Sequence, residues 1–120
     1  MKKKSKKVSA SIILVNFNNS KYLVRCLKSL KNQSNKNFEV IFVDDQSTDN
    51  SVSNTKKFFK KNNFLKSKIL VNKNKTKFGS YNQINCIVAA LNKCKNNIIL
   101  FLDSDDFFLK DKVKETLKFF

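Results

Sequence analysis

The chain has 120 residues and a mass of 13.9 kDa, and 41% of its residues are hydrophobic, twelve of them Phe. This is enough to bury the core of one domain, so the composition excludes a disordered tail, and no apolar run reaches the ~20 residues of a membrane-spanning helix. The formal net charge of +16 would attract polyanions, but the lysines are scattered over all polar stretches, which disfavours nucleic-acid binding.

Residues 1–7 are expected to form a basic tail and residues 8–120 a single domain. No cleavage-like motif follows the tail, so the sequence indicates a cytoplasmic protein whose tail allows peripheral contact with the inner face of the membrane. The three cysteines have no CxxC spacing and the chain has no His, which favours reduced, buried thiols over a zinc site.

Apolar, β-rich runs at residues 9–15, 38–43, 68–71 and 97–102 predict four strands that are covered on both faces. Apolar residues at helical spacing lie after each run, and Ser20 is expected to cap the first helix. The helical stripes are Tyr22, Leu23, Cys26, Leu27 and Leu30; Val52, Thr55, Phe58 and Phe59; Ile84, Ile87, Val88 and Leu91; and Val113, Leu117 and Phe120.

The resulting order, βαβαβαβα, predicts an α/β fold with a mostly parallel sheet, helices on both faces and right-handed crossovers. All acids except Glu39 and Glu115 are aspartates in two groups, residues 44–49 and 103–111, and each group follows a predicted strand. In open α/β sheets, ligands bind at the carboxyl ends of the strands, so the two groups are expected to meet in one cleft.

The "DSD" stretch places Asp103 and Asp105 on the same side of an extended backbone, with Ser104 pointing away. Paired carboxylates repel each other unless a cation compensates them, and Mg²⁺ or Mn²⁺ that neutralises a diphosphate would do so. The alternative is that Asp105 or Asp106 only caps the following helix, as Asp111 is expected to do.

The "VDDQSTDNS" stretch is read as a strand end, an acidic pair and a helix start. One of its carboxylates could accept the N3–H of a uracil or bind a ribose hydroxyl, while Ser47, Thr48 or Asp49 caps the helix. The alternative is that all of these polar residues serve only as caps and turns.

Three stretches together resemble the N-terminal half of a family 2 glycosyltransferase with the GT-A fold, and they occur in the order of that family. They are "VSASIILVNFNNSKYLVRCLKSLKNQSNKNFEVIFVDDQSTDNS", "NKNKTKFGSYNQIN" and "IILFLDSDDFFLKDKV". The resemblance implies transfer of a sugar from a nucleotide-diphospho-sugar, a UDP-sugar, to a glycan or lipid-linked acceptor during surface polysaccharide assembly.

The resemblance also implies roles for individual residues. Asp45 would recognise the uracil with Asp44 beside it, Asp103 would bind the ribose and the metal, and Asp105 would be the principal ligand of Mg²⁺ or Mn²⁺. The remaining residues of the implied nucleotide-sugar site are Val15, Asn16, Phe17, Asn18, Asn85 and Ser104.

The sequence departs from the family pattern at several points. Ile84 stands where the family often has Arg, so a phosphate or base contact would be lost or supplied by a lysine such as Lys77. The catalytic base is expected on a segment beyond Phe120, and Asp106 is expected only to support the site. A non-catalytic nucleotide-sugar-binding module, or a split enzyme completed by a C-terminal partner chain, therefore remains an alternative.

Three unrelated classes fit less well. A phosphotransfer receiver domain needs its acidic pair after the first strand, whereas here the pair follows the second. A phosphatase needs its "DxD" after the first strand, whereas here it follows the fourth. A dinucleotide-binding domain needs GxGxxG, which the single glycine cannot supply.

Overall fold

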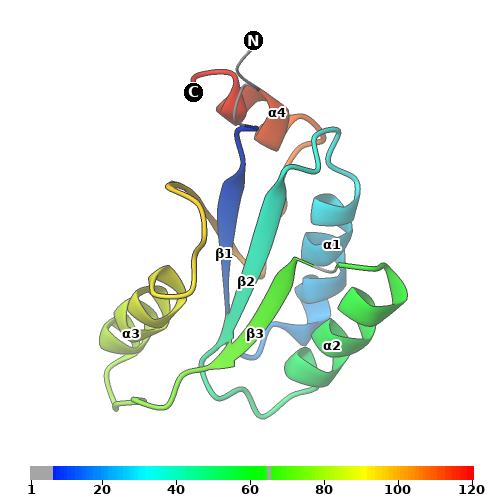
Figure 1. Cartoon of the computed structure of the whole chain (residues 1–120). Helices are drawn as coiled ribbons and strands as arrows, with labels where there is room; N and C mark the ends of the chain where they lie inside the picture. The colour runs from blue at the N-terminus through cyan, green and yellow to red at the C-terminus, as the bar shows by residue number, and fades with distance from the viewer. Residues whose placement is uncertain (1–6, 65) are drawn as a thin grey trace, which may run out of the picture.

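The computed structural model describes residues 7–64 and 66–120, in which strands and helices alternate along the chain (Figure 1). The elements are β1 (Ala10–Asn16), α1 (Ser20–Lys31), β2 (Phe38–Asp44), α2 (Ser51–Lys61), β3 (Ser67–Val71), α3 (Gly79–Leu91), β4 (Ile98–Asp103) and α4 (Lys112–Leu117). This confirms the predicted element order, and each strand coincides with one of the four apolar runs.

The four strands form one parallel sheet in the order β3-β2-β1-β4. The strand order reverses between β1 and β4, where α/β sheets bind their ligands. The register pairs Asn16 with Asp44 and Val15 with Asp103, which brings the carboxyl ends of β1, β2 and β4 to the same edge. The expectation that the two acidic groups share one edge is therefore confirmed for the aspartates at the ends of β2 and β4, whereas Asp111 lies at the start of α4 instead.

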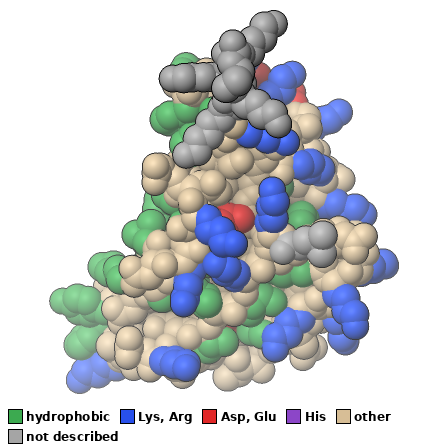
Figure 2. Space-filling view, viewed as in Figure 1, with side chains coloured by type: hydrophobic (Ala, Val, Ile, Leu, Met, Phe, Trp, Pro, Cys, Tyr) green, Lys and Arg blue, Asp and Glu red, His purple; other side chains and the backbone are tan. Residues whose placement is uncertain are grey.

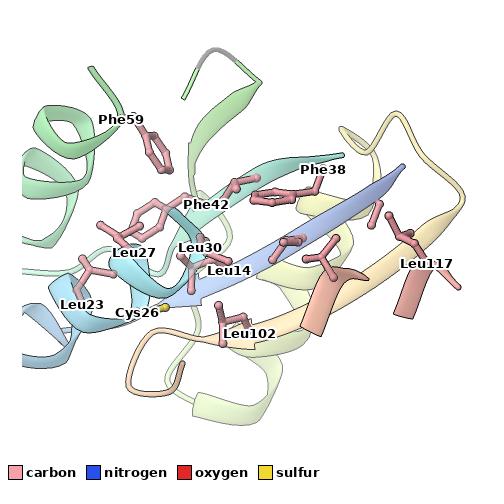
Figure 3. Close-up of a cluster of buried hydrophobic side chains, with 14 residues drawn as sticks. Leu14, Leu23, Cys26, Leu27, Leu30, Phe38, Phe42, Phe59, Leu102 and Leu117 are labelled. Carbon is pink, nitrogen blue, oxygen red and sulfur yellow. The ribbon is translucent and has the colours of Figure 1, made fainter. Parts of the chain in front are cut away.

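Helices α1, α2 and α4 cover one face of the sheet and form the larger hydrophobic cluster (Figure 3). The apolar side of α1 supplies Leu23, Cys26, Leu27 and Leu30, which pack on alternate residues of β1 and β2 because side chains along a strand alternate between its faces. Helix α4 lies beside the start of β1, at the end of the sheet opposite the acidic edge (Figure 1).

Helix α3 covers the other face, but not with the apolar stripe that the sequence suggested. Its buried residues are Asn82, Cys86 and Ala90, and the last two pack with Ile13, Ile41 and Val43. The apolar stripe instead points away from the sheet, with Ile84 54% and Val88 52% exposed, and hydrophobic side chains gather on the surface over α3 (Figure 2). The small side chains face inward because they allow the helix to approach the sheet closely.

Strand β4 also differs from expectation, because it is not covered on both faces. It lies at the edge of the sheet, and Phe101, on the α3 side, is 56% exposed. Helix α3 packs against β1, β2 and β3 and leaves this part of the sheet open.

The helix caps correct two expectations. Helix α1 begins at Ser20 itself, which follows Asn19, and the Ser20 N–H donates to the carboxylate of Asp49 (3.0 Å). Asp111 does precede α4, but its carboxylate accepts a hydrogen bond from the Ser34 hydroxyl (2.5 Å) instead of capping the helix.

The expected basic tail falls largely on residues 1–6, which lie outside the described residues. Over the part of the chain that the structure covers, no helix has both the length and the apolar character needed to cross a membrane. The three thiols are free, as expected; Cys26 and Cys86 are buried and Cys94 is half-buried.

Candidate functional site

A cleft of about 470 Å³ lies at the point where the strand order reverses, on the acidic edge of the sheet. Its lining includes seven of the residues that the sequence suggested for the site: Val15, Phe17, Asp45, Lys77, Asp103, Ser104 and Asp105. The cleft also contains residues that the sequence analysis missed: Asn19, Lys75, Thr76, Gly79, Asn82 and Gln83.

The side-chain carboxylates of Asp103 and Asp105 are exposed in the cleft, and neither has a hydrogen-bond or ion-pair partner among the described residues. The loop that carries them is held by Ser104, which is fully buried. Its N–H donates to the Val15 carbonyl (3.2 Å) and its hydroxyl accepts from Asn19 (2.9 Å). The two carboxylates are therefore held at the edge of the sheet while their oxygens stay free.

Arg25, on α1, supports the same loop from the side. Its guanidinium donates to the backbone carbonyl of Asp105 (2.9 Å) and lies 4.8 Å from the ring centroid of Phe107. This contact places a positive charge beside the loop that carries three carboxylates.

The donor set of Asp103 and Asp105 fits a hard divalent cation. Mg²⁺ in nucleotide sites is usually bound through one or two carboxylates, with water and phosphate oxygens in its other positions. No group of three or more acidic or Cys side chains able to hold an ion occurs within the described ranges, so an ion here would need oxygens from a ligand. The residues thus suit a metal that arrives with a diphosphate.

Asp106 has a different role from its neighbours. Its carboxylate accepts the N–H of Phe107 (2.8 Å), and it does not line the cleft. Helix α4 begins only at Lys112, so neither Asp105 nor Asp106 caps a helix, and that alternative for the "DSDD" stretch is wrong.

The adjacent acids Asp44 and Asp45 also have different environments. Asp44 is buried, and its carboxylate accepts hydrogen bonds from Asn16 Nδ2 (2.8 Å), the Ser47 hydroxyl (2.7 Å) and the Ser47 N–H (2.8 Å). Asp45 faces the cleft, where Asn72 donates to its Oδ1 (3.0 Å) and Lys75 Nζ lies 4.0 Å from its Oδ2. Turn chemistry therefore accounts for Asp44 but not for Asp45.

Asn16 and Asn18 lie outside the cleft and connect the loops around it. Asn18 has a positive φ of 50°, which Asn tolerates better than most residues, and its side-chain oxygen accepts the backbone N–H of Thr48 (2.8 Å). In return, the Asn18 N–H donates to the Ser47 hydroxyl (2.9 Å). These contacts fasten the loop after β1 to the loop after β2.

Asp49 completes this connection. Burial alone would raise the pKa of its carboxyl, but hydrogen bonds from Ser51 and Ser20 outweigh burial and lower the pKa below its ordinary value. Asp49 therefore remains ionised at neutral pH and accepts hydrogen bonds from Ser20 and Ser51, the first residues of α1 and α2. The N-cap position of α2 is held by Asn50, so it is none of the three residues that the sequence suggested, Ser47, Thr48 and Asp49.

The structure places Asn82, rather than Asn85, in the cleft. Asn82 is buried and exchanges hydrogen bonds with the backbone of Thr76, whereas Asn85 donates to the Asn74 carbonyl (3.0 Å). Asn72 could have been anticipated, because it follows β3 at the same edge of the sheet. Lys75 gave no such signal among the many lysines of the chain.

A parallel α/β sheet with free carboxylates at its switch point defines a ligand-binding domain of the open α/β class. Comparison with known proteins identifies the family. The model of the family "Glycosyl transferase family 2" matches residues 11–120, and the chain belongs to this family of glycosyltransferases.

Two curated relatives illustrate the match. The poly(ribitol-phosphate) β-N-acetylglucosaminyltransferase TarS of Staphylococcus aureus is 32% identical over 111 residues, which cover 91% of this chain and 18% of TarS. The glycosyltransferase GlyG of Streptococcus pneumoniae is 34% identical over 107 residues, 89% of this chain and 33% of GlyG. The chain thus spans a third or less of the length of these relatives.

Solved structures agree with this assignment. Residues 1–349 of S. aureus TarS in complex with UDP-GlcNAc superpose with a TM-score of 0.76 at 29% identity, covering 93% of this chain and 31% of that one. A mannosyltransferase of Pyrobaculum calidifontis with GDP-Man and Mn²⁺ superposes with a TM-score of 0.72 over 87% of this chain and 29% of that one; at 17% identity, it supports the fold alone. The fold is therefore that of GT-A glycosyltransferases.

Proposed function

We propose that this chain binds a UDP-sugar together with Mg²⁺ or Mn²⁺ and forms the donor-binding part of an enzyme that transfers the sugar to an acceptor hydroxyl. The observation that carries the proposal is that the carboxylates of Asp103 and Asp105, which have no partner among the described residues, line the same cleft as Asp45. Family membership supports glycosyl transfer, and the UDP-GlcNAc bound in the TarS structure supports a uridine donor.

In this proposal, each acidic residue has a distinct task. Asp103 and Asp105 hold the divalent ion, whose chemistry when bound is to neutralise charge on the diphosphate leaving group. Asp45 accepts a hydrogen bond from the N–H of the base, since an ionised carboxylate can only accept. Val15, in β1, and Phe17, just after this strand, line the same cleft and would form part of its wall.

The acceptor side of the reaction is not assigned to any residue of this chain. Asp106 does not line the cleft, and its carboxylate accepts the N–H of Phe107. The base that deprotonates the acceptor hydroxyl is therefore expected on a further segment or a partner chain. A glycan or a lipid-linked sugar remains the proposed acceptor class.

Isothermal titration calorimetry with UDP, in the presence and absence of Mn²⁺, tests the donor site. We expect metal-dependent binding in the unaltered chain, loss of the metal dependence in Asp105→Asn, and loss of most of the affinity in Asp45→Ala. Glu115→Gln is the matched control, because it removes an exposed carboxylate whose one ion pair with the described residues is that with Lys118, and it should leave binding unchanged.

Circular dichroism of each variant must show the native fold before its titration is interpreted. If the folded, unaltered chain bound UDP equally well without metal, the role of Asp103 and Asp105 would be wrong. If it bound no UDP under any condition, the proposed donor function itself would be refuted.

A further inference from the structure

We propose that Lys75 is a specificity-determining residue that selects uracil over cytosine, an inference that rests on the proposed binding of UDP at Asp45. The observation is that Lys75 places an ammonium next to the Asp45 carboxylate, inside the same cleft as Phe17. No motif of the sequence singled out this lysine.

The position of the ammonium is set by contacts on three sides. Lys75 Nζ donates to the backbone carbonyl of Asp45 (2.8 Å), lies 4.0 Å from Asp45 Oδ2 and lies 4.0 Å from the ring centroid of Phe17. The Lys75 side chain is 29% exposed, so it is partly shielded from water, which strengthens its interactions with the carboxylate and the ring.

The loop that carries Lys75 is itself anchored. The Asn72 N–H donates to the Asp44 carbonyl (2.7 Å), and the Asn72 side chain donates to Asp45 Oδ1 and accepts from the Asn74 N–H. The anchor therefore uses one carboxylate oxygen of Asp45 and leaves the other, Oδ2, facing Lys75 and the cleft.

The hydrogen-bond donors of Lys75 and the acceptor of Asp45 that remain unused are complementary to uracil. An ammonium has three donors, and Lys75 uses one of them on the Asp45 carbonyl. Asp45 Oδ2 accepts no hydrogen bond from the described residues, so it is available to the N3–H of uracil. That N–H has a carbonyl on each side, and whichever way the ring enters, one of these acceptors lies on the side of Lys75.

Cytosine fits the same pair poorly in this position. Its N3 carries a lone pair, which would face the carboxylate. In the orientation that turns C4 toward Lys75, the neighbouring group is an amine, with which an ammonium cannot pair because both groups are donors. Unmet polar groups of this kind give strong discrimination between otherwise similar ligands. Asp45 thus recognises N3 of the base, and Lys75 adds recognition of the neighbouring carbonyl.

Lys77 provides the matched control within the same loop. It also lines the cleft, but its Nζ lies over the Phe78 ring, 5.4 Å from the centroid, and it makes no ion pair or hydrogen bond with the described residues. Removing Lys77 changes the charge near a diphosphate by the same amount as removing Lys75, without altering the neighbourhood of Asp45.

The test measures the affinities of UDP and CDP by competition calorimetry in the presence of Mn²⁺. A charge-assisted hydrogen bond is worth roughly a tenfold change in affinity. We therefore expect Lys75→Met to weaken UDP about tenfold and CDP much less, so that the preference for UDP shrinks. Lys77→Met should weaken both ligands by the same factor, and Lys75→Arg should keep most of the preference.

Two results would overturn the inference, and they are distinguishable. If Lys75→Met, folded by circular dichroism, weakened UDP and CDP equally or left both unchanged, Lys75 would have no role in base selection while the proposed donor site stood. If the unaltered chain bound no UDP, the proposed function and this inference would both be wrong.

Discussion

Replacing Asp44 with alanine is expected to destabilise the fold strongly, although this acid lies beside a proposed ligand-binding residue. The Asp44 carboxylate accepts three hydrogen bonds, all from Asn16 and Ser47, and only 1% of its surface is exposed. A hydrogen bond to a charged group contributes about 1.5–3 kcal/mol, and its loss leaves buried donors unsatisfied. Because Asn16 keeps a second contact with Ser47 (3.2 Å), the three bonds are not additive.

We therefore expect Asp44→Ala to lower the free energy of unfolding by about 3–5 kcal/mol, a large part of the ~5–15 kcal/mol typical of a domain. Urea denaturation followed by circular dichroism at pH 7 would show this as a fall in midpoint of roughly 2 M, given the usual dependence on denaturant. Asp105→Ala, which removes an exposed carboxylate without hydrogen bonds, should change the free energy by no more than about 0.5 kcal/mol.

The reasoning would be refuted by an Asp44→Ala variant that keeps the midpoint of the unaltered chain but no longer binds UDP. That result would mean that Asp44 contacts the nucleotide directly, and that its contacts with Asn16 and Ser47 contribute little to stability.

Two further predictions concern groups outside the acidic pair. Burial, with a smaller contribution from Asp106, raises the pKa of the Cys26 thiol to about 12, and burial raises that of Cys86 to about 11, so both should stay protonated at pH 8. Alkylation mapped by mass spectrometry should label half-buried Cys94 first, and rapid labelling of Cys26 in the folded protein would contradict this assignment. Gly79→Ala should be neutral or stabilising by up to about 1 kcal/mol in thermal unfolding, since the added Cβ meets nothing within 4 Å at the first residue of a helix; a clear loss of stability would show that the glycine is required.

The features that the sequence predicted correctly are those with a local signature. Apolar runs of strand length mark all four strands, and polar residues after β2 and β4 must share an edge once the sheet is parallel. Asp45, Asp103 and Asp105 could therefore be placed in one cleft without coordinates, because chain order and strand direction determine their position.

The predictions from the sequence fail where the orientation of a side chain depends on packing or on residues far away in the sequence. In α3, hydrophobicity favours Ile84 and Val88 as the buried face, but contact with the sheet selects the smaller Cys86 and Ala90. Asp44 and Asp45 are chemically identical neighbours, and only the loops around them decide which one faces the cleft. Lys75 is one of 25 basic residues in a loop without periodicity, so only its contacts distinguish it.

The reciprocal hydrogen bonds between the loops after β1 and β2 bear on how this protein can evolve. Asn18, Ser47 and Asp49 support the cleft from outside it, while the side chains of cleft residues such as Lys77 and Gln83 make no hydrogen bonds with the described residues. Substitutions at the latter positions can therefore alter what the cleft accepts without weakening the framework that shapes it. A single scaffold of this kind can diversify toward different ligands one side chain at a time.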